Sequence, residues 1–108
     1  MDFPEASPAS VQLYEEVAST LAPLGVKAAA MFGMPTLKVE GKAVAGLYGD
    51  AMNFKLSGPA HAEALALQGA HLFDPSGLGR PMKAWVVVPV AHAASWERLA
   101  RLALAEMG

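Results

Sequence analysis

Residues 36–56, which read TLKVEGKAVAGLYGDAMNFKL, determine the expected fold class of this chain. Apolar and polar residues alternate up to residue 40, an apolar run covers 43–48, and alternation resumes after Gly49-Asp50. A period of two is typical of β-strands, and turns this short join antiparallel neighbours. We therefore predict an antiparallel meander of three or four strands within 26–56, with a hairpin turn at Glu40-Gly41-Lys42.

Helical periodicity flanks the meander on both sides. Ser7-Pro8 has the form of an N-cap followed by proline in the first turn, and apolar residues at three- and four-residue spacing predict a helix over 8–23. The later expected elements are a helix over 59–68 capped by Ser57, strands over 70–73 and 84–88, and a helix over 92–107. This order, α-β(3 or 4)-α-β(2)-α, predicts one α+β domain over 1–108 with helices packed on an antiparallel sheet.

The strand over 84–88 is apolar at both alternating sets of positions, from Trp85 to Val88. Such a strand is usually inside a sheet and covered on both faces. We therefore expect Trp85 to be buried against the first or the third helix.

Composition and charge exclude several function classes. The chain has 108 residues, of which 54% are hydrophobic and 17% charged, so intrinsic disorder is excluded. It has no cysteine, which removes disulfides and thiolate chemistry. The net charge of −2 predicts no autonomous nucleic-acid binding. The acidic start and the shortness of the longest apolar run, 84–91, predict a cytoplasmic protein with neither a signal peptide nor a membrane helix.

No catalytic or metal-binding motif is found. Ser57-Gly58 lacks the glycine frame of a nucleophile elbow, and His61, His71 and His92 do not have the spacing of metal ligands. The glycine-rich segment 76–81 lacks the Lys-Ser/Thr pair of a phosphate-binding loop. We therefore expect no catalytic residue, no metal and no cofactor.

A weaker signal comes from three lysines in the expected strands. Lys38, Lys55 and Lys83 can line up with Asn53 on an open face of the sheet and form a mildly basic strip. Lysines that protect sheet edges and keep the surface soluble are equally expected at these positions.

Several ordered motifs give the chain a family resemblance. They are Met31-Phe32-Gly33, Val39-Glu40-Gly41-Lys42, Gly49-Asp50, Phe54-Lys55-Leu56, Gly79-Arg80-Pro81-Met82 and Trp85-Val86-Val87-Val88-Pro89. Together they cover about residues 26–107 and resemble the TfoX/Sxy N-terminal domain family.

This resemblance implies an α+β fold of the secretion-chaperone-like type. Two-domain members of the family are regulators of natural competence that act as transcriptional co-activators and carry a second, helical domain. Because the sequence ends at Gly108, we expect a single-domain member without that second domain, and no role in DNA transactions that depends on it.

The resemblance also separates scaffold positions from candidate contact positions. Turn geometry, core packing and strand ends explain Phe32, Gly33, Gly41, Phe54, Trp85 and Pro89 as scaffold. The expected exposed exceptions are Lys42 at the hairpin tip and Arg80 and Met82 in the loop before the last strand. These three are the candidate binding residues.

Three hypotheses about function follow. The first is a non-enzymatic regulatory or protein-interaction module of the TfoX N-terminal type, with an unidentified protein partner; one option is a homodimer formed through a sheet edge or the apolar surplus. The alternative is a small-molecule or anion-binding domain that uses the Arg80 loop. The third, an enzyme, has no supporting motif.

Overall fold

The computed structural model describes residues 5–31, 34–74, 77–79 and 81–106. Over these residues the elements are α1 (Pro8–Leu21), η1 (Ala22–Leu24, a 3-10 turn), β1 (Val26–Met31), β2 (Met34–Val39), β3 (Lys42–Leu47), β4 (Ala51–Lys55), α2 (Gly58–Leu65), β5 (His71–Phe73), β6 (Met82–Pro89), η2 (Val90–Ser95, 3-10) and α3 (Trp96–Ala105). The predicted α+β class and the order of elements are confirmed, with four strands in the first meander.

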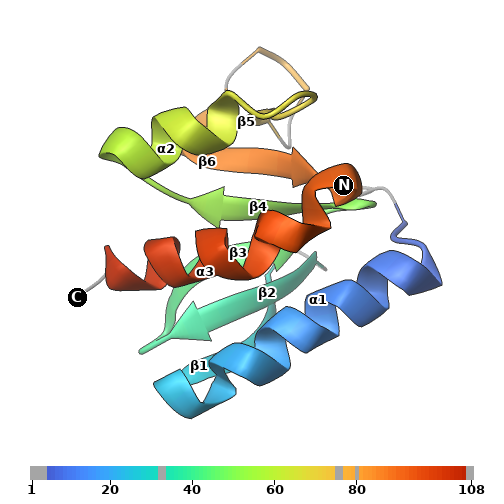
Figure 1. The fold of residues 1–108 in the computed structure, drawn as a ribbon, viewed down its shortest axis with the longest axis vertical. Helices are drawn as coiled ribbons and strands as arrows, with labels where there is room; N and C mark the ends of the chain where they lie inside the picture. Colours follow the sequence, from blue (N-terminus) through green and yellow to red (C-terminus); the bar gives the residue numbers. More distant parts are fainter. Residues whose placement is uncertain (1–4, 32–33, 75–76, 80, 107–108) are drawn as a thin grey trace.

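The strands form one antiparallel sheet in the order β1-β2-β3-β4-β6-β5. The three α-helices lie on the same face of this sheet (Figure 1). β1 and β5 are the two edge strands, and β5 is only three residues long. The sheet therefore has one face covered by helices and one face without a helix among the described residues.

The turn between β2 and β3 lies where the sequence predicts it but is one residue shorter, because Lys42 already belongs to β3. Val39 pairs with Lys42, so Glu40 and Gly41 form a two-residue loop. Both have positive φ, 50° and 78°, which defines a type I′ turn. Gly41 takes this conformation at little cost, whereas Glu40 does not.

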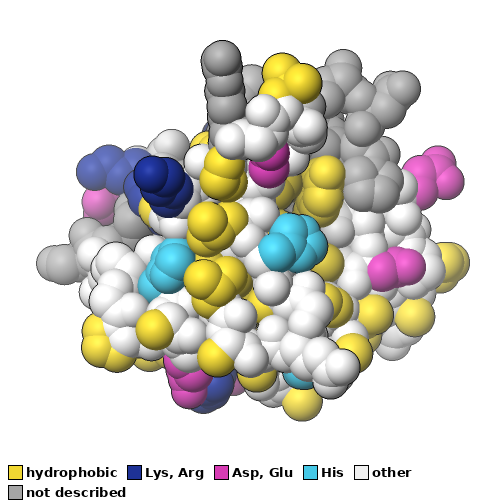
Figure 2. Space-filling view, turned by 90° about the horizontal axis from the view of Figure 1, so that it is seen from above, with side chains coloured by type: hydrophobic (Ala, Val, Ile, Leu, Met, Phe, Trp, Pro, Cys, Tyr) yellow, Lys and Arg dark blue, Asp and Glu magenta, His cyan; other side chains and the backbone are white. Residues whose placement is uncertain are grey.

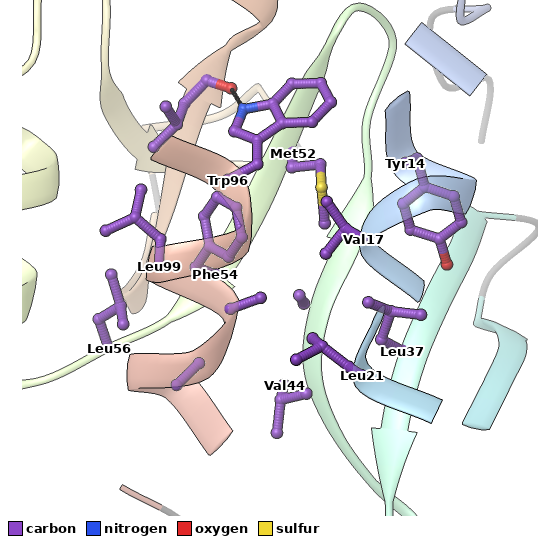
Figure 3. Packing of buried hydrophobic residues seen from close by; sticks show 14 of the residues in the cluster. Tyr14, Val17, Leu21, Leu37, Val44, Met52, Phe54, Leu56, Trp96 and Leu99 are labelled. Carbon is purple, nitrogen blue, oxygen red and sulfur yellow. Dashed lines mark hydrogen bonds between the residues drawn. The ribbon is translucent and has the colours of Figure 1, made fainter. Parts of the chain in front are cut away.

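The main core lies between the helices and the sheet (Figure 3). Its fully buried side chains include Leu21 of α1, Leu37 of β2, Phe54 of β4 and Trp96 of α3. The Nε1 of Trp96 donates a hydrogen bond to the carbonyl of Val88 at 3.2 Å, so this indole is both packed and satisfied. This contact fixes α3 against β6.

A second, smaller apolar cluster lies on the helix-free face. It consists of Met34, Ala51, Phe73, Trp85 and Val87, all buried, and Tyr48 packs edge-on against Phe73 with ring centroids 5.0 Å apart. The burial of Trp85 is thus confirmed, but the prediction that it packs against the first or third helix is wrong. In β6 the side chains of Val86 and Val88 face the helices, and those of Trp85 and Val87 face the other way because strand side chains alternate.

Asp50 joins the first helix to the sheet. Its Oδ1 accepts hydrogen bonds from the backbone N–H of Ser7 and from the Oγ of Ser10, both at 2.8 Å. Its own carbonyl accepts from the N–H of Val90 at 2.8 Å. The Oγ of Ser7 in turn accepts from the N–H of Ser10, which confirms Ser7 as the N-cap of α1.

The other helix boundaries differ in detail from the prediction. α2 ends at Leu65 rather than 68, and Ser57 does not cap it with its side chain; the Ser57 Oγ donates to Glu106 Oε1 instead, at 3.1 Å. The third helical segment is split, because His92 has non-helical dihedral angles and α3 starts only at Trp96. Among the described residues, no helix is long and apolar enough to cross a membrane.

Candidate functional site

Two of the three predicted binding residues, Lys42 and Met82, are described, and they lie on strands that are not neighbours. Lys42 is exposed as the first residue of β3, and Met82 is 43% exposed as the first residue of β6. In the sheet order β4 separates these two strands, which corresponds to roughly 10 Å between their axes. Arg80, and the scaffold residues Phe32 and Gly33, lie outside the described residues. The remaining scaffold positions, Gly41, Phe54, Trp85 and Pro89, occupy a turn, two buried sites and a strand end.

The described part of the β5–β6 loop is organised around Asp74. The Asp74 carboxylate accepts the backbone N–H groups of Gly77 at 3.1 Å and Gly79 at 2.9 Å. Gly77 and Gly79 both have positive φ, so glycine is suited to these two positions. The Asp74 carboxylate thus holds the described part of the loop in its turn. Leu78, at the tip of this loop, is 77% exposed.

The three histidines are used in local hydrogen bonds to carbonyl groups. His61 Nε2 lies 2.8 Å from the carbonyl of Lys83, and His92 Nε2 lies 2.8 Å from the carbonyl of Gln68. His71 Nδ1 lies 3.2 Å from the carbonyl of Gly69. Since a carbonyl only accepts, each of these ring nitrogens carries the proton. Within the described residues no group of three or more His, Asp or Glu side chains converges as a metal site would require.

Around these histidines the surface is partly apolar. Figure 2 shows hydrophobic side chains gathered between histidines when the molecule is seen from the end at which α2 and β5 lie. Leu65 of α2 is 37% exposed.

One hollow opens between the end of β4 and the last turn of α3. It measures about 190 Å³ and is lined by Lys55, Leu56, Ser57, Ala84, Ala103 and Glu106. The hydroxyl of Ser57 there donates to a carboxylate rather than to a histidine base. This hydrogen bond links the start of α2 to the end of α3.

The β1 edge is a feature that site reasoning from the sequence missed. Lys27, Ala28, Ala29 and Ala30 are all exposed, and within the described residues β1 pairs only with β2. An edge strand of this kind presents unpaired N–H and C=O groups to the outside. The three consecutive alanines weaken the strand signal in the sequence, yet they are the reason that the backbone is accessible here.

The helix-free face carries three lysines, at positions 27, 38 and 55, and we call this surface the lysine face. Lys27 and Lys38 are cross-strand neighbours, whereas β3 separates Lys38 from Lys55. Lys27 of β1 stands opposite Lys38 of β2, and Lys55 of β4 stands opposite Trp85 of β6. Asn53 shares this face, so the predicted alignment of Lys38, Asn53 and Lys55 is confirmed. Lys83 is exposed, but it lies beside an irregularity in the β5–β6 register, and pairing does not fix its face.

Asn53 is fully buried at the centre of this face. Its Nδ2 makes one long contact to the Sδ of Met34 at 3.8 Å, and its Oδ1 has no hydrogen-bond partner among the residues that the structure describes. Thr36, on the other side of Gly46, is also buried, and its Oγ1 donates to the carbonyl of Met34 at 2.9 Å. The Oδ1 of Asn53 therefore carries a desolvation cost that the neighbouring residues do not offset.

Comparison with protein-family models, with curated proteins and with solved structures yields no match to this chain. The resemblance to the TfoX N-terminal domain stays a prediction from the sequence motifs.

Proposed function

We propose that this chain is a non-enzymatic protein-interaction module that binds an extended segment of a partner protein along the β1 edge. The carrying observation is the exposure of residues 27–30 on a strand that pairs on one side only in the described structure. Added strands gain affinity from backbone hydrogen bonds, and small side chains such as alanine leave the backbone open to them.

The composition of β1 supports this proposal. Natural edge strands are protected by prolines, by charges, by bulges or by short length. β1 has six residues, no proline and a single charged residue, Lys27, and its pairing with β2 runs without a register shift. The opposite edge, β5, has three residues and an irregular register. The β1 edge is thus weakly protected against pairing with another chain, and the β5 edge is strongly protected.

The polar groups of the described residues favour binding over catalysis. The histidines are engaged with carbonyls, and Ser57 donates to Glu106. Arg98 and Arg101 are held by Glu63 and Glu97 in exposed ion pairs at 2.7 and 3.2 Å. This leaves the backbone of β1 and the lysine face as the surfaces with unused bonding capacity.

A regulatory role of the TfoX type is the finer part of this proposal, and the sequence motifs alone support it. The anion-binding alternative depends on Arg80, which is outside the described residues, and no described contact favours it.

Two proline variants of β1 test the edge. In an antiparallel pair, alternate residues direct their N–H toward the neighbouring strand or away from it. Of Ala28→Pro and Ala29→Pro, one therefore removes a β1–β2 hydrogen bond and lowers the melting temperature, and the other removes only an outward donor. The variant whose melting temperature is unchanged is the edge-blocking variant, and the variant whose melting temperature falls is its control.

The binding readout is affinity purification of the tagged chain from its native cell. We expect proteins captured by the wild type to be lost from the edge-blocking variant while its melting temperature stays unchanged. Capture of the same proteins by the wild type and the edge-blocking variant would contradict binding through β1.

A further inference from the structure

The lysines and the acidic residues of this protein lie in different structural elements. Every lysine of the chain, at positions 27, 38, 42, 55 and 83, lies in a strand, and none of the six strands contains an aspartate or glutamate. The acidic residues lie in helices, turns and the N-terminal segment, among them Glu15 and Glu16 of α1 and Glu97 of α3. The net charge of −2 thus conceals a sheet in which every charged strand residue is a lysine.

The lysines nearest the β1 edge form a like-charge pair. Lys27 and Lys38 are direct cross-strand partners. Val26, next to Lys27, and Leu37, next to Lys38, lie in the helix-side core, so both lysines point to the helix-free face. Side chains at such positions have Cβ atoms about 5 Å apart, and like charges there are destabilising. Neither lysine has an ion-pair partner among the described residues. The pair therefore keeps an uncompensated double positive charge beside the open edge.

We propose that the β1 edge selects an acidic extended segment of a partner protein, whose carboxylates are bound by Lys27 and Lys38. This inference rests on the proposed edge binding and adds the chemistry of the partner. A strand added to β1 presents every second side chain to the helix-free face. An acidic residue opposite Lys27 lies at cross-strand distance from it, and Lys38 is one strand further away, within reach of two long side chains. Binding would relieve the repulsion within the pair.

A second copy of this chain fits the edge less well. Two β1 strands joined antiparallel about a two-fold axis normal to the sheet keep the same faces on the same side, so a further Lys27 would join the existing pair. Because β1 has no acidic residue, no compensating charge would arrive with it. The charge pattern therefore favours a different, acidic partner over a homodimer.

The test uses blocked hexapeptides titrated into the isotopically labelled full chain and followed by NMR. The acidic probe alternates threonine with glutamate, and the matched neutral probe alternates threonine with glutamine. We expect the acidic probe to bind more tightly, to shift the amides of residues 27–30, and to weaken as salt is raised from about 50 to about 500 mM. Equal binding of both probes, or tighter binding of the neutral one, would overturn the acidic specificity but leave edge binding intact. Failure of both probes would contradict both proposals.

Charge variants assign the effect to the pair. Lys27→Gln and Lys38→Gln should each weaken the acidic probe by about two- to fivefold, the range for exposed ion pairs. Lys27→Glu creates an opposite-charge pair with Lys38 and should weaken the probe while raising the melting temperature, which a merely unfolded variant would not do. Lys42→Glu is the matched control. Lys42 pairs with Val39, which packs against the helix-side core, so Lys42 lies on the opposite face from Lys27 and Lys38, and the variant should leave binding unchanged.

Two further outcomes would overturn the proposal. One is concentration-dependent dimerisation in sedimentation that the edge-blocking proline variant abolishes, because the edge would then belong to a second copy. The other is binding of single-stranded DNA of mixed sequence at the same lysines more tightly than the acidic probe, because the face would then recognise phosphates.

Discussion

The Oδ1 of Asn53 lies 2.8 Å from the position that a Cβ atom on Gly46 would occupy. Gly46 is the cross-strand partner of Asn53, and the carbonyl oxygen of Pro35 lies 3.0 Å from the same point. Gly46 therefore makes room for a buried carboxamide in the middle of the sheet. It does so in ordinary strand conformation, so space rather than backbone angle explains the glycine.

The first prediction concerns this space. Gly46→Ala should destabilise the chain by about 1–3 kcal/mol, because Asn53 and the backbone of Pro35 must both move. Urea unfolding of the single variants and of Gly46→Ala/Asn53→Ala gives the coupling between the two sites. We expect the double variant to be less destabilised than the sum, since removal of the carboxamide frees part of the space. Full additivity of the two changes in unfolding free energy would show that the methyl group of the Gly46→Ala variant does not contact the Asn53 side chain.

A second prediction concerns the turn residue Glu40. Its φ of 50° is in the left-handed region, which non-glycine residues occupy at a cost. Asparagine followed by glycine is the favoured pair for this type I′ turn. Glu40→Asn should therefore stabilise the chain by roughly 0.5–1 kcal/mol. A lower unfolding midpoint for the variant would contradict the turn type.

Trp85 gives a third prediction, which also separates the two apolar clusters. Trp85 is 8% exposed on the helix-free face, and Trp85→Ala should cost about 3–5 kcal/mol, as for other large aromatic residues in a core. Because Trp85 does not pack against a helix, the near-ultraviolet signal of Trp96 should persist in the folded variant. A loss below about 1 kcal/mol would show that the smaller cluster is a surface feature.

The two tryptophans illustrate how much of the fold can be predicted from sequence. The elements follow from periodicity, and Trp96 can be assigned to the helix-side core because α3 has one apolar stripe. Trp85 belongs to a strand whose odd- and even-numbered residues are both apolar, so the alternation of side chains does not tell which face of the sheet Trp85 occupies. The face is decided by the register with β4, which depends on side chains distant in the sequence.

The candidate site was only partly predictable for a related reason. The alignment of Lys38, Asn53 and Lys55 follows from alternation once the meander is assumed, and the register bears it out. The role of β1 does not follow, since Ala28, Ala29 and Ala30 have weak strand propensity and nothing local marks an edge. Edge position is a property of the strand order, which short-range patterns do not contain.

Asp50 provides a prediction about acid stability. The backbone N–H of Ser7, and then the hydroxyl of Ser10, hold the pKa of the Asp50 carboxyl below its ordinary value. Its contribution is therefore complete above the pKa of the unfolded state and is lost as the pH falls through the lower pKa of the folded state. Asp50→Asn should melt at a lower temperature than the wild type at pH 7, and the two curves should converge at strongly acidic pH. A constant difference across this range would show that the charge of Asp50 is not involved.

Tyr14 provides the matching prediction at alkaline pH. The side chain is 5% exposed in α1, and its hydroxyl has no hydrogen-bond partner in the described part of the chain. Burial, with a smaller effect from Glu15, raises its pKa to about 12. The unfolded chain ionises this tyrosine near pH 10, so stability should fall as the pH rises from 10 toward 12. At pH 11 the loss is on the order of 1 kcal/mol, because the tyrosine is largely ionised in the unfolded state and largely neutral in the folded state. Tyr14→Phe removes both the unpaired hydroxyl and this loss, so it should match or exceed the wild type at pH 8 and gain further at pH 11. The measurement is urea unfolding of both chains at the two pH values, and an unchanged difference between them would mean that the hydroxyl of Tyr14 reaches water in the folded state.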